Sequence, residues 1–159
     1  FSMFYLSFVE GNNTSDENFW QANIKSQQLT AWRGFSFETL CFYHIRQIKH
    51  ALGISGVHTE SSPWSSKQKN KGAQIDMLID RADNIVNICE MKFSEDDFTV
   101  TSSYNRQLRH KMTVFCEETK CRKTLHLTLV TTYGLTFNEY SGNFPKVITM
   151  DDLFNRSVY

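Results

Sequence analysis

The chain has 159 residues, of which 40% are hydrophobic and 21% charged, a composition typical of a globular domain and not of a disordered one. Seventeen acidic and seventeen basic residues cancel, so the overall charge neither indicates nor excludes a nucleic-acid partner. No apolar run reaches the length of a membrane span, and no secretory signal segment is recognisable. We therefore expect one domain with a good core, in the cytoplasm, with Cys41 and Cys89 as reduced, buried thiols.

The first thirty residues have the pattern of an appendage. Residues 1–10 are apolar and aromatic, Gly11 follows them, and Thr14 or Ser15 can cap a short helix that reaches Trp20. A start at a residue other than Met suggests a piece of a larger protein. We expect 1–30 to be a helical linker to a missing upstream region and 31–159 to be the folded domain.

Residues 32–52 have the strongest helical pattern in the chain. Apolar positions recur there at helical spacing, and Gly53 supplies a stop. Glu38 falls on the first two turns, at the rim of the apolar stripe. An acid at this place either interacts favourably with the helix N-terminus or belongs to a functional site, and the pattern leaves both interpretations open.

Three short runs after this helix predict strands. The first covers residues 57–64, and the next two, 73–79 and 85–93, are apolar runs joined by a polar turn rich in Asp and Asn. Such a pair predicts a β-hairpin. In a hairpin the beginning of the first strand lies opposite the end of the second, so residues at these two places come together.

The two hairpin runs carry the residues that are most informative about chemistry. Asp76 lies early in the first run, and Glu90 and Lys92 lie at the end of the second. Two carboxylates can hold a hard divalent cation through oxygen, and a nearby lysine can position or deprotonate a water. The pattern indicates metal-assisted hydrolysis. The alternative is an ion cluster without catalysis, in which Asp76 neutralises Lys92.

The remaining segments complete the order of elements. A helix is expected over 102–118, strands over 125–131 and 146–148, and a short last helix whose capping box is Thr149 with Asp152. The apolar stripe of the 102–118 helix consists of Tyr104, Leu108, Met112 and Phe115. The resulting order of helix, three strands, helix and strand predicts the α/β class, with a mixed sheet and helices on its faces.

Charge is unevenly distributed along the chain. Residues 76–97 hold seven acids and two bases, whereas residues 101–123 hold six Lys or Arg and two Glu. An acidic centre beside a basic segment suits a metal site that acts on a polyanion. Ordinary solvated faces explain the same distribution equally well.

Together these residues resemble a known family. A helix with Glu38, a strand with Asp76, a strand with Glu90-Met91-Lys92 and a following basic helix are similar to the PD-(D/E)XK nuclease superfamily, over roughly residues 32–131. Ile75 stands where the family conventionally has proline. The resemblance implies a restriction-endonuclease-like αβββαβ core with a mixed central sheet flanked by helices.

A narrower resemblance covers nearly the whole chain. Trp-Arg-Gly-Phe-Ser-Phe-Glu at 32–38, Gln-Ile-Lys-His-Ala-Leu-Gly-Ile at 47–54 and Lys-Gly-Ala-Gln-Ile-Asp at 71–76 look like the C-terminal domain of prokaryotic AAA-type ATPases of the archaeal ATPase family. This resemblance implies an upstream ATPase domain and a winged-helix-like segment as partners within a longer protein. No P-loop motif is present in these 159 residues, so ATP binding through a P-loop is not expected of them.

The resemblance also implies roles for individual residues. Asp76, Glu90 and the backbone carbonyl of Met91 would hold Mg²⁺ or Mn²⁺, which would polarise a phosphoryl oxygen of DNA. Lys92 would orient or deprotonate the attacking water or stabilise developing charge, and Glu38 would bind through a water or a second metal. Candidate substrate-binding residues are Gln74, which precedes Asp76 by two positions, and, on the second helix, Tyr104, Arg106, Gln107 and Arg109.

The sequence therefore predicts a metal-dependent deoxyribonuclease domain. The alternative is a non-catalytic module that keeps the nuclease fold for DNA binding or protein association. The complete set of Asp76, Glu90 and Lys92 favours the enzyme, because a degenerate domain usually loses one member. Oligomeric state is not predicted.

Overall fold

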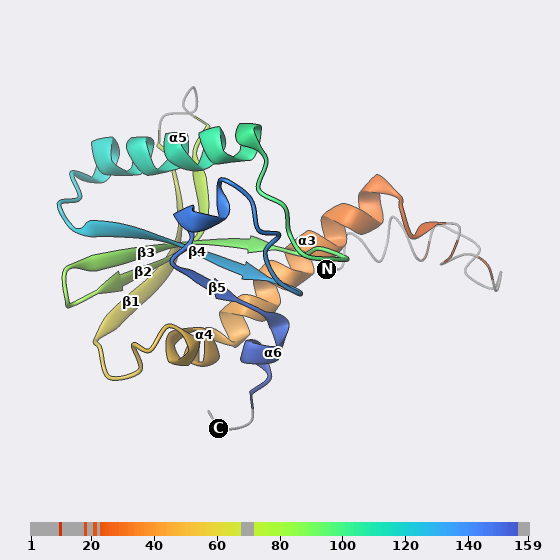
Figure 1. Ribbon diagram of the computed structural model, residues 1–159, viewed down its shortest axis with the longest axis horizontal. Helices are drawn as coiled ribbons and strands as arrows, with labels where there is room; N and C mark the ends of the chain where they lie inside the picture. Colours follow the sequence, from red (N-terminus) through yellow and green to blue (C-terminus); the bar gives the residue numbers. More distant parts are fainter. Residues whose placement is uncertain (1–9, 11–17, 19–20, 22, 68–71, 156–159) are drawn as a thin grey trace.

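The protein is described by a computed structural model that covers residues 10, 18, 21, 23–67 and 72–155 (Figure 1). The two helical segments expected within residues 1–20 lie mostly outside the described residues. Within the described residues, no helix is long and apolar enough to cross a membrane.

The expected first helix is longer than predicted and is divided in two. Helix α3 spans Gln27–Tyr43, with the Ser26 hydroxyl accepting a hydrogen bond from the Leu29 backbone N–H as its N-cap. The chain leaves helical geometry at His44, where φ is −102° and ψ is 25°, and helix α4 then spans Ile45–Ala51. Gly53 has φ of +72°, the left-handed conformation that ends helices, so the predicted stop is confirmed.

The expected order of the remaining elements is confirmed with small shifts at their ends. The sheet has the strand order β1-β2-β3-β4-β5, in which β2 runs antiparallel to its neighbours β1 and β3, and β3, β4 and β5 are parallel. The strands are β1 Thr59–Ser65, β2 Gln74–Arg81, β3 Ile85–Lys92, β4 Thr124–Thr131 and β5 Lys146–Ile148. The further helical elements are α5 Ser102–Thr119, the 3₁₀ turn η2 Ser141–Asn143 and α6 Met150–Leu153. This is the α/β class with the mixed sheet that the sequence predicts.

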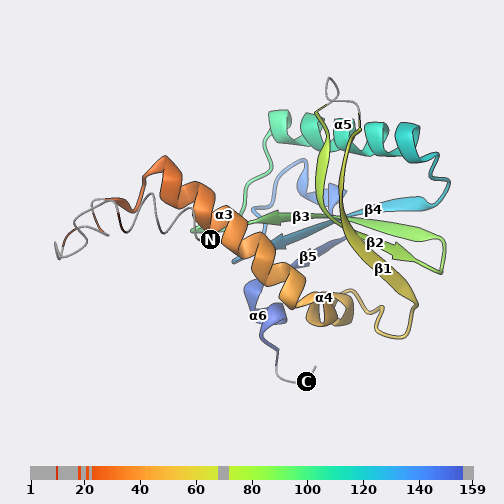
Figure 2. The ribbon, with the colours of Figure 1, turned by 180° about the vertical axis from the view of Figure 1, so that it is seen from behind.

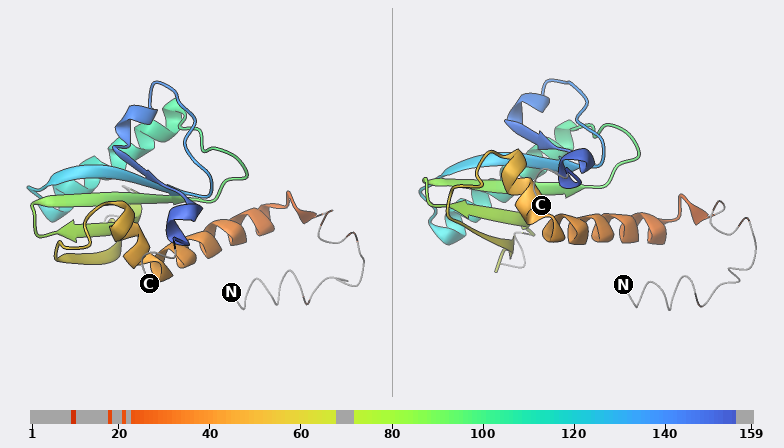
Figure 3. Two further views of the ribbon diagram at one scale, coloured as in Figure 1. Left: turned by 60° about the horizontal axis from the view of Figure 1, so that its bottom comes forward. Right: turned by 90° about the horizontal axis from the view of Figure 1, so that it is seen from below.

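Helices cover both faces of the sheet, which gives three layers. Figures 1 and 2 show α5 on one face and α3, α4 and α6 on the other. The core is divided accordingly: one buried cluster joins Phe37 and Ile48 to β2 and β3, and the second joins Leu108 and Phe115 of α5 to the opposite face. Figure 3 shows the N-terminal part of α3 projecting beyond the sheet.

A bulge in β2 changes which face its side chains meet. In the β1–β2 ladder Ser62 pairs with Leu78 and Trp64 pairs with Ile75, so three steps along β2 oppose two along β1. Ile75 consequently packs in the α5 cluster, whereas Met77, two residues later, packs in the α3 cluster. The extra residue of the bulge lies between these two positions, where Asp76 is found.

Candidate functional site

Glu90 occupies a fully buried position under α5. It lies on β3 two residues after Ile88, which packs in the α5 cluster, and strand alternation directs both side chains to that face. Its side chain is 0% exposed. Lys111 Nζ donates to Glu90 Oε1 at 2.7 Å and to Oε2 at 2.9 Å, and the Tyr104 hydroxyl donates to Oε2 at 2.9 Å. A buried carboxylate is thus held by one bidentate cation and one neutral donor.

Asp76 lies where the backbones of β2 and β3 stop pairing. The ladder between the two strands ends at Met77 opposite Cys89, and beyond it the Met91 N–H donates to Asp76 Oδ2 at 2.8 Å. The carboxylate therefore replaces a backbone acceptor at the point where the strands separate. Because N–H and C=O groups of one strand residue point to the same side, the Met91 carbonyl is directed toward β2 as well.

Lys92 lies between the two carboxylates. Its Nζ is 3.4 Å from Asp76 Oδ2 and 3.6 Å from Glu90 Oε2, and it lies 5.9 Å from the centre of the Tyr104 ring. These distances are longer than those of Lys111, and the Lys92 side chain is 28% exposed. Lys92 is therefore shared by the two acids, while Lys111 is bound closely by Glu90. We call Asp76, Glu90, Lys92 and Lys111 the acid–lysine cluster.

Glu38 adjoins the acid–lysine cluster from α3. The preceding residue, Phe37, is buried and packs edge-on against Phe93 just after β3, with 6.3 Å between ring centroids. Arg33 also holds α3 at this place, through an ion pair of 2.8 Å with Glu95. Burial raises the pKa of Glu38, and the negative charge of Asp76 adds to the rise, while Lys92 opposes it. The charges of both strand acids therefore act on Glu38, and its role in the site stays a prediction.

The Tyr104 hydroxyl is a hydrogen-bond donor in this environment. Burial raises its pKa, and the charge of Glu90 beside it raises the pKa further. The hydroxyl therefore stays protonated at neutral pH and donates to Glu90 Oε2. Burial likewise raises the pKa of the Cys41 thiol to about 12, with Glu38 as the next cause, so this cysteine is an inert core residue.

Lys111 is the residue of this site that the sequence interpretation missed. It lies seven residues after Tyr104 and four before Phe115, so helical spacing places it on the apolar stripe of α5. A lysine on the core-facing stripe of an amphipathic helix is unusual and needs a buried anion as partner. That spacing was a signal in the sequence, but the neighbouring Arg109 and His110 made the segment resemble a solvated polar face.

The other predicted substrate residues lie apart from these contacts. Arg106 and Gln107 are solvent exposed, and Arg106 Nη1 is 3.4 Å from the Ser102 hydroxyl. Arg109 is exposed beside a cavity of about 320 Å³ that Asn105 and His126 also line. Gln74 opens β2 opposite Ser65 and is exposed, and the bulge after it breaks the two-residue alternation that would place its side chain on the same face as that of Asp76. Of the four α5 candidates, only Tyr104 contacts the acid–lysine cluster, and the roles of the others stay predictions.

The donor set suits a hard cation that takes few protein ligands. Among the described residues, no group of three or more His, Cys, Asp or Glu side chains is arranged to hold a metal ion. Mg²⁺ commonly binds through one or two carboxylates, with waters and substrate phosphates as its other ligands. Asp76 and Glu90 supply two carboxylates that already share one cationic centre, and within the described residues Asp76 Oδ1 accepts no hydrogen bond. The residues present fit Mg²⁺ or Mn²⁺ on this count.

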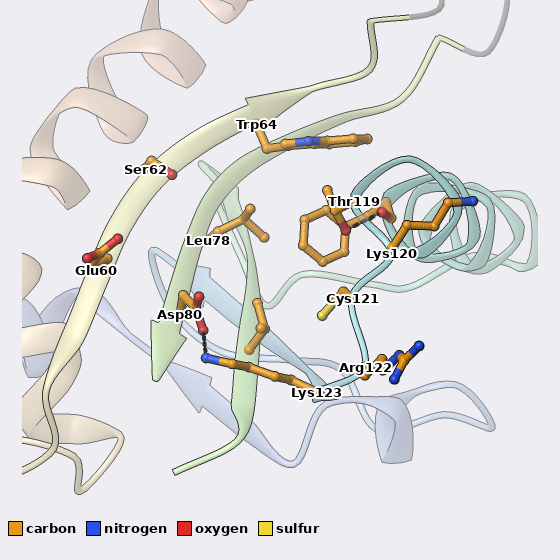
Figure 4. Close-up of a pocket in the computed structure, with 12 residues that line it drawn as sticks. Glu60, Ser62, Trp64, Leu78, Asp80, Thr119, Lys120, Cys121, Arg122 and Lys123 are labelled. Carbon is orange, nitrogen blue, oxygen red and sulfur yellow. Dashed lines mark hydrogen bonds and ion pairs between the residues drawn. The ribbon is translucent and has the colours of Figure 1, made fainter. Parts of the chain in front are cut away.

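A larger cavity lies elsewhere on the α5 side of the sheet. Figure 4 shows it between the β1–β2 hairpin and the end of α5, with a volume of about 560 Å³. Trp64 and Phe115 form apolar walls, and an ion pair joins Lys123 to Asp80. Lys120 and Arg122 lie just after α5, where cations stabilise a helix C-terminus. None of the acid–lysine cluster lines this cavity.

Comparisons with known proteins add little to this geometry. No protein-family model matches the chain, and no curated protein matches it. A crystal structure of a protein of unknown function, AF1548, is similar with a TM-score of 0.45 and 13% sequence identity. The similarity covers 69% of this chain, which spans 56% of the length of that protein.

Proposed function

We propose that this chain is a metal-dependent nuclease domain that hydrolyses phosphodiester bonds of DNA in the cytoplasm, as part of a larger ATPase. One observation carries the proposal: carboxylates from two different strands, Asp76 and Glu90, approach the same ammonium group of Lys92. Two carboxylates that approach one ammonium group, at the point where β2 and β3 stop pairing, are suited to bind a hard divalent cation such as Mg²⁺ or Mn²⁺.

In this proposal each residue of the site has a separate role in hydrolysis. Asp76, Glu90 and the Met91 carbonyl hold the metal, which when bound supplies Lewis-acid polarisation of a phosphoryl oxygen. Lys92, which is partly exposed, orients the attacking water or stabilises the negative charge that develops on the phosphoryl group. Glu38, whose charge interacts with Asp76 and Lys92, would bind through a water of the metal or through a second metal.

A second function is favoured by a different observation. Glu90 is completely buried, and both of its oxygens are already bonded by Lys111 and Tyr104. A carboxylate satisfied in this way also serves a purely structural purpose. Under this alternative the domain keeps the fold as a non-catalytic module that binds DNA or another protein.

Cleavage of DNA separates the two functions. Supercoiled plasmid and branched DNA are incubated with the protein in Mg²⁺ or Mn²⁺, and wild type is compared with Asp76→Ala and Lys92→Ala. Asp96→Ala is the matched acid control, because Asp96 is exposed in the segment after β3 and has no contact with the acid–lysine cluster. The nuclease proposal predicts cleavage by wild type and the control, and loss of cleavage in both test variants.

Two outcomes contradict the nuclease proposal. Cleavage that survives both Asp76→Ala and Lys92→Ala removes these residues from the chemistry. If wild type retards DNA in a gel shift, cuts none of it with either metal, and binds equally well after Asp76→Ala, the non-catalytic module is the better account.

A further inference from the structure

The contacts of Lys111 suggest a role that goes beyond holding the fold. We propose that Lys111 is an internal counter-ion that occupies Glu90 until a phosphate of bound DNA draws it away, so that the divalent metal and DNA bind cooperatively. The inference rests on the proposed nuclease function and adds the order in which its components come together.

Lys111 and a metal compete for the same oxygens. Lys111 Nζ lies 2.7 and 2.9 Å from the two oxygens of Glu90. A magnesium ion binds carboxylate oxygen at about 2.0–2.1 Å. An ion at Glu90 would therefore lie within about 5 Å of the Lys111 ammonium, where two positive charges repel strongly in a partly buried site. Metal affinity in the absence of DNA is reduced by this competition.

Glu90 cannot leave the site, but Lys111 can. The carboxylate is 0% exposed and is anchored on a central strand, whereas the Lys111 side chain is 19% exposed and ends a flexible four-carbon stem. Lys92 is already farther from Glu90, at 3.6 Å, and is shared with Asp76. The tight contact to be broken is thus the one that Lys111 makes.

A displaced ammonium needs a new anion, and the substrate supplies one. A phosphodiester oxygen accepts hydrogen bonds from lysine as a carboxylate does, and it reaches the rim of the site only when DNA is bound. Phosphate then takes Lys111, which frees Oε1 of Glu90 for the metal while the Tyr104 hydroxyl keeps its hydrogen bond to Oε2. Each ligand then raises the affinity for the other by the same factor.

Mn²⁺ binding without turnover tests this coupling. Free Mn²⁺ is measured by electron paramagnetic resonance in titrations of the full chain, at low temperature, with and without a saturating DNA duplex whose integrity is checked by electrophoresis. Without DNA, Lys111→Met is expected to tighten Mn²⁺ binding about tenfold or more. Lys111→Arg keeps the charge and the bidentate geometry and stays near wild type. Lys120→Met, which removes one positive charge at the end of the same helix, is also expected to bind Mn²⁺ with an affinity near that of wild type.

The effect of DNA on Mn²⁺ binding provides a second test, in which wild type is compared with Lys111→Met. DNA is expected to tighten Mn²⁺ binding to wild type at least about fivefold, and the effect is expected to disappear in Lys111→Met. The proposal is overturned if DNA leaves Mn²⁺ affinity of wild type unchanged, or if Lys111→Met binds Mn²⁺ no more tightly than wild type. If the protein cleaves DNA but DNA does not change its Mn²⁺ affinity, only the proposed role of Lys111 is refuted. If DNA tightens Mn²⁺ binding but no DNA is cleaved, the proposed nuclease function is refuted.

Discussion

The bond between Lys111 and Glu90 leads to a stability prediction whose size follows from its geometry. Lys111→Met removes the bidentate cation from a fully buried carboxylate while keeping the apolar stem of the side chain. Breaking a buried pair in this way typically costs about 3–5 kcal/mol. Tyr104 still donates at 2.9 Å and Lys92 remains at 3.6 Å, so we expect the free energy of unfolding to fall by about 2–3 kcal/mol, at or just below the lower end of that range.

Equilibrium urea unfolding followed by circular dichroism measures this loss of stability. A double-mutant cycle shows whether the loss comes from the interaction between Lys111 and Glu90. In a Glu90→Gln background the buried charge is absent, so Lys111→Met is expected to cost less than about 1 kcal/mol there. The reasoning is refuted if Lys111→Met alone costs under about 0.5 kcal/mol, the range of ordinary surface substitutions, or if it costs the same in both backgrounds.

Three further predictions concern the neighbours of this bond. Tyr104→Phe removes the hydroxyl that donates to Glu90 and should lower the free energy of unfolding by about 1.5 kcal/mol in urea titrations, with an unchanged value contradicting that hydrogen bond. Asp76→Ala leaves the Met91 N–H without its acceptor and should cost about 1–3 kcal/mol by the same measurement, whereas Asp76→Asn keeps an acceptor oxygen and should cost clearly less. Burial raises the pKa of Glu38 above its ordinary value of 4.5, so the folded state holds this proton more tightly than the unfolded chain and loses stability as the pH rises through 4.5 and above. Glu38→Gln should therefore unfold at a higher temperature than wild type at pH 7, with the difference shrinking below pH 4.5; a lower melting temperature at pH 7 would count against this reading.

Local patterns explain why most of the fold was predictable. Apolar periodicity located the helices and strands, and the polar turn between β2 and β3 is a short-range signal, closed by Asn84 with φ of +67°. The capping box of Thr149 and Asp152 is likewise contained within four residues and is present in the structure. The convergence of Asp76 with Glu90 followed from hairpin pairing alone.

The features that were missed depend on residues distant in the sequence. The bulge in β2 arises from its pairing with β1, where Pro63 lies at the edge of the sheet, and no pattern within β2 reveals it. The break at His44 interrupts a sequence whose apolar spacing continues on both sides. The partner of Lys111 lies twenty-one residues away on another element, so its burial is a tertiary property.

The rate of plasmid cleavage in Mg²⁺ by Lys92→Ala, relative to wild type at equal occupancy of DNA, tests the central claim most directly. Lys92 is the group that both carboxylates approach, and it is partly exposed, so its removal should leave the fold intact. The account predicts a loss of about 10²-fold or more in the cleavage rate, the usual size for a positioned catalytic group, with DNA affinity little changed. Wild-type rates in Lys92→Ala, with measurable metal-dependent cleavage in both proteins, would contradict it.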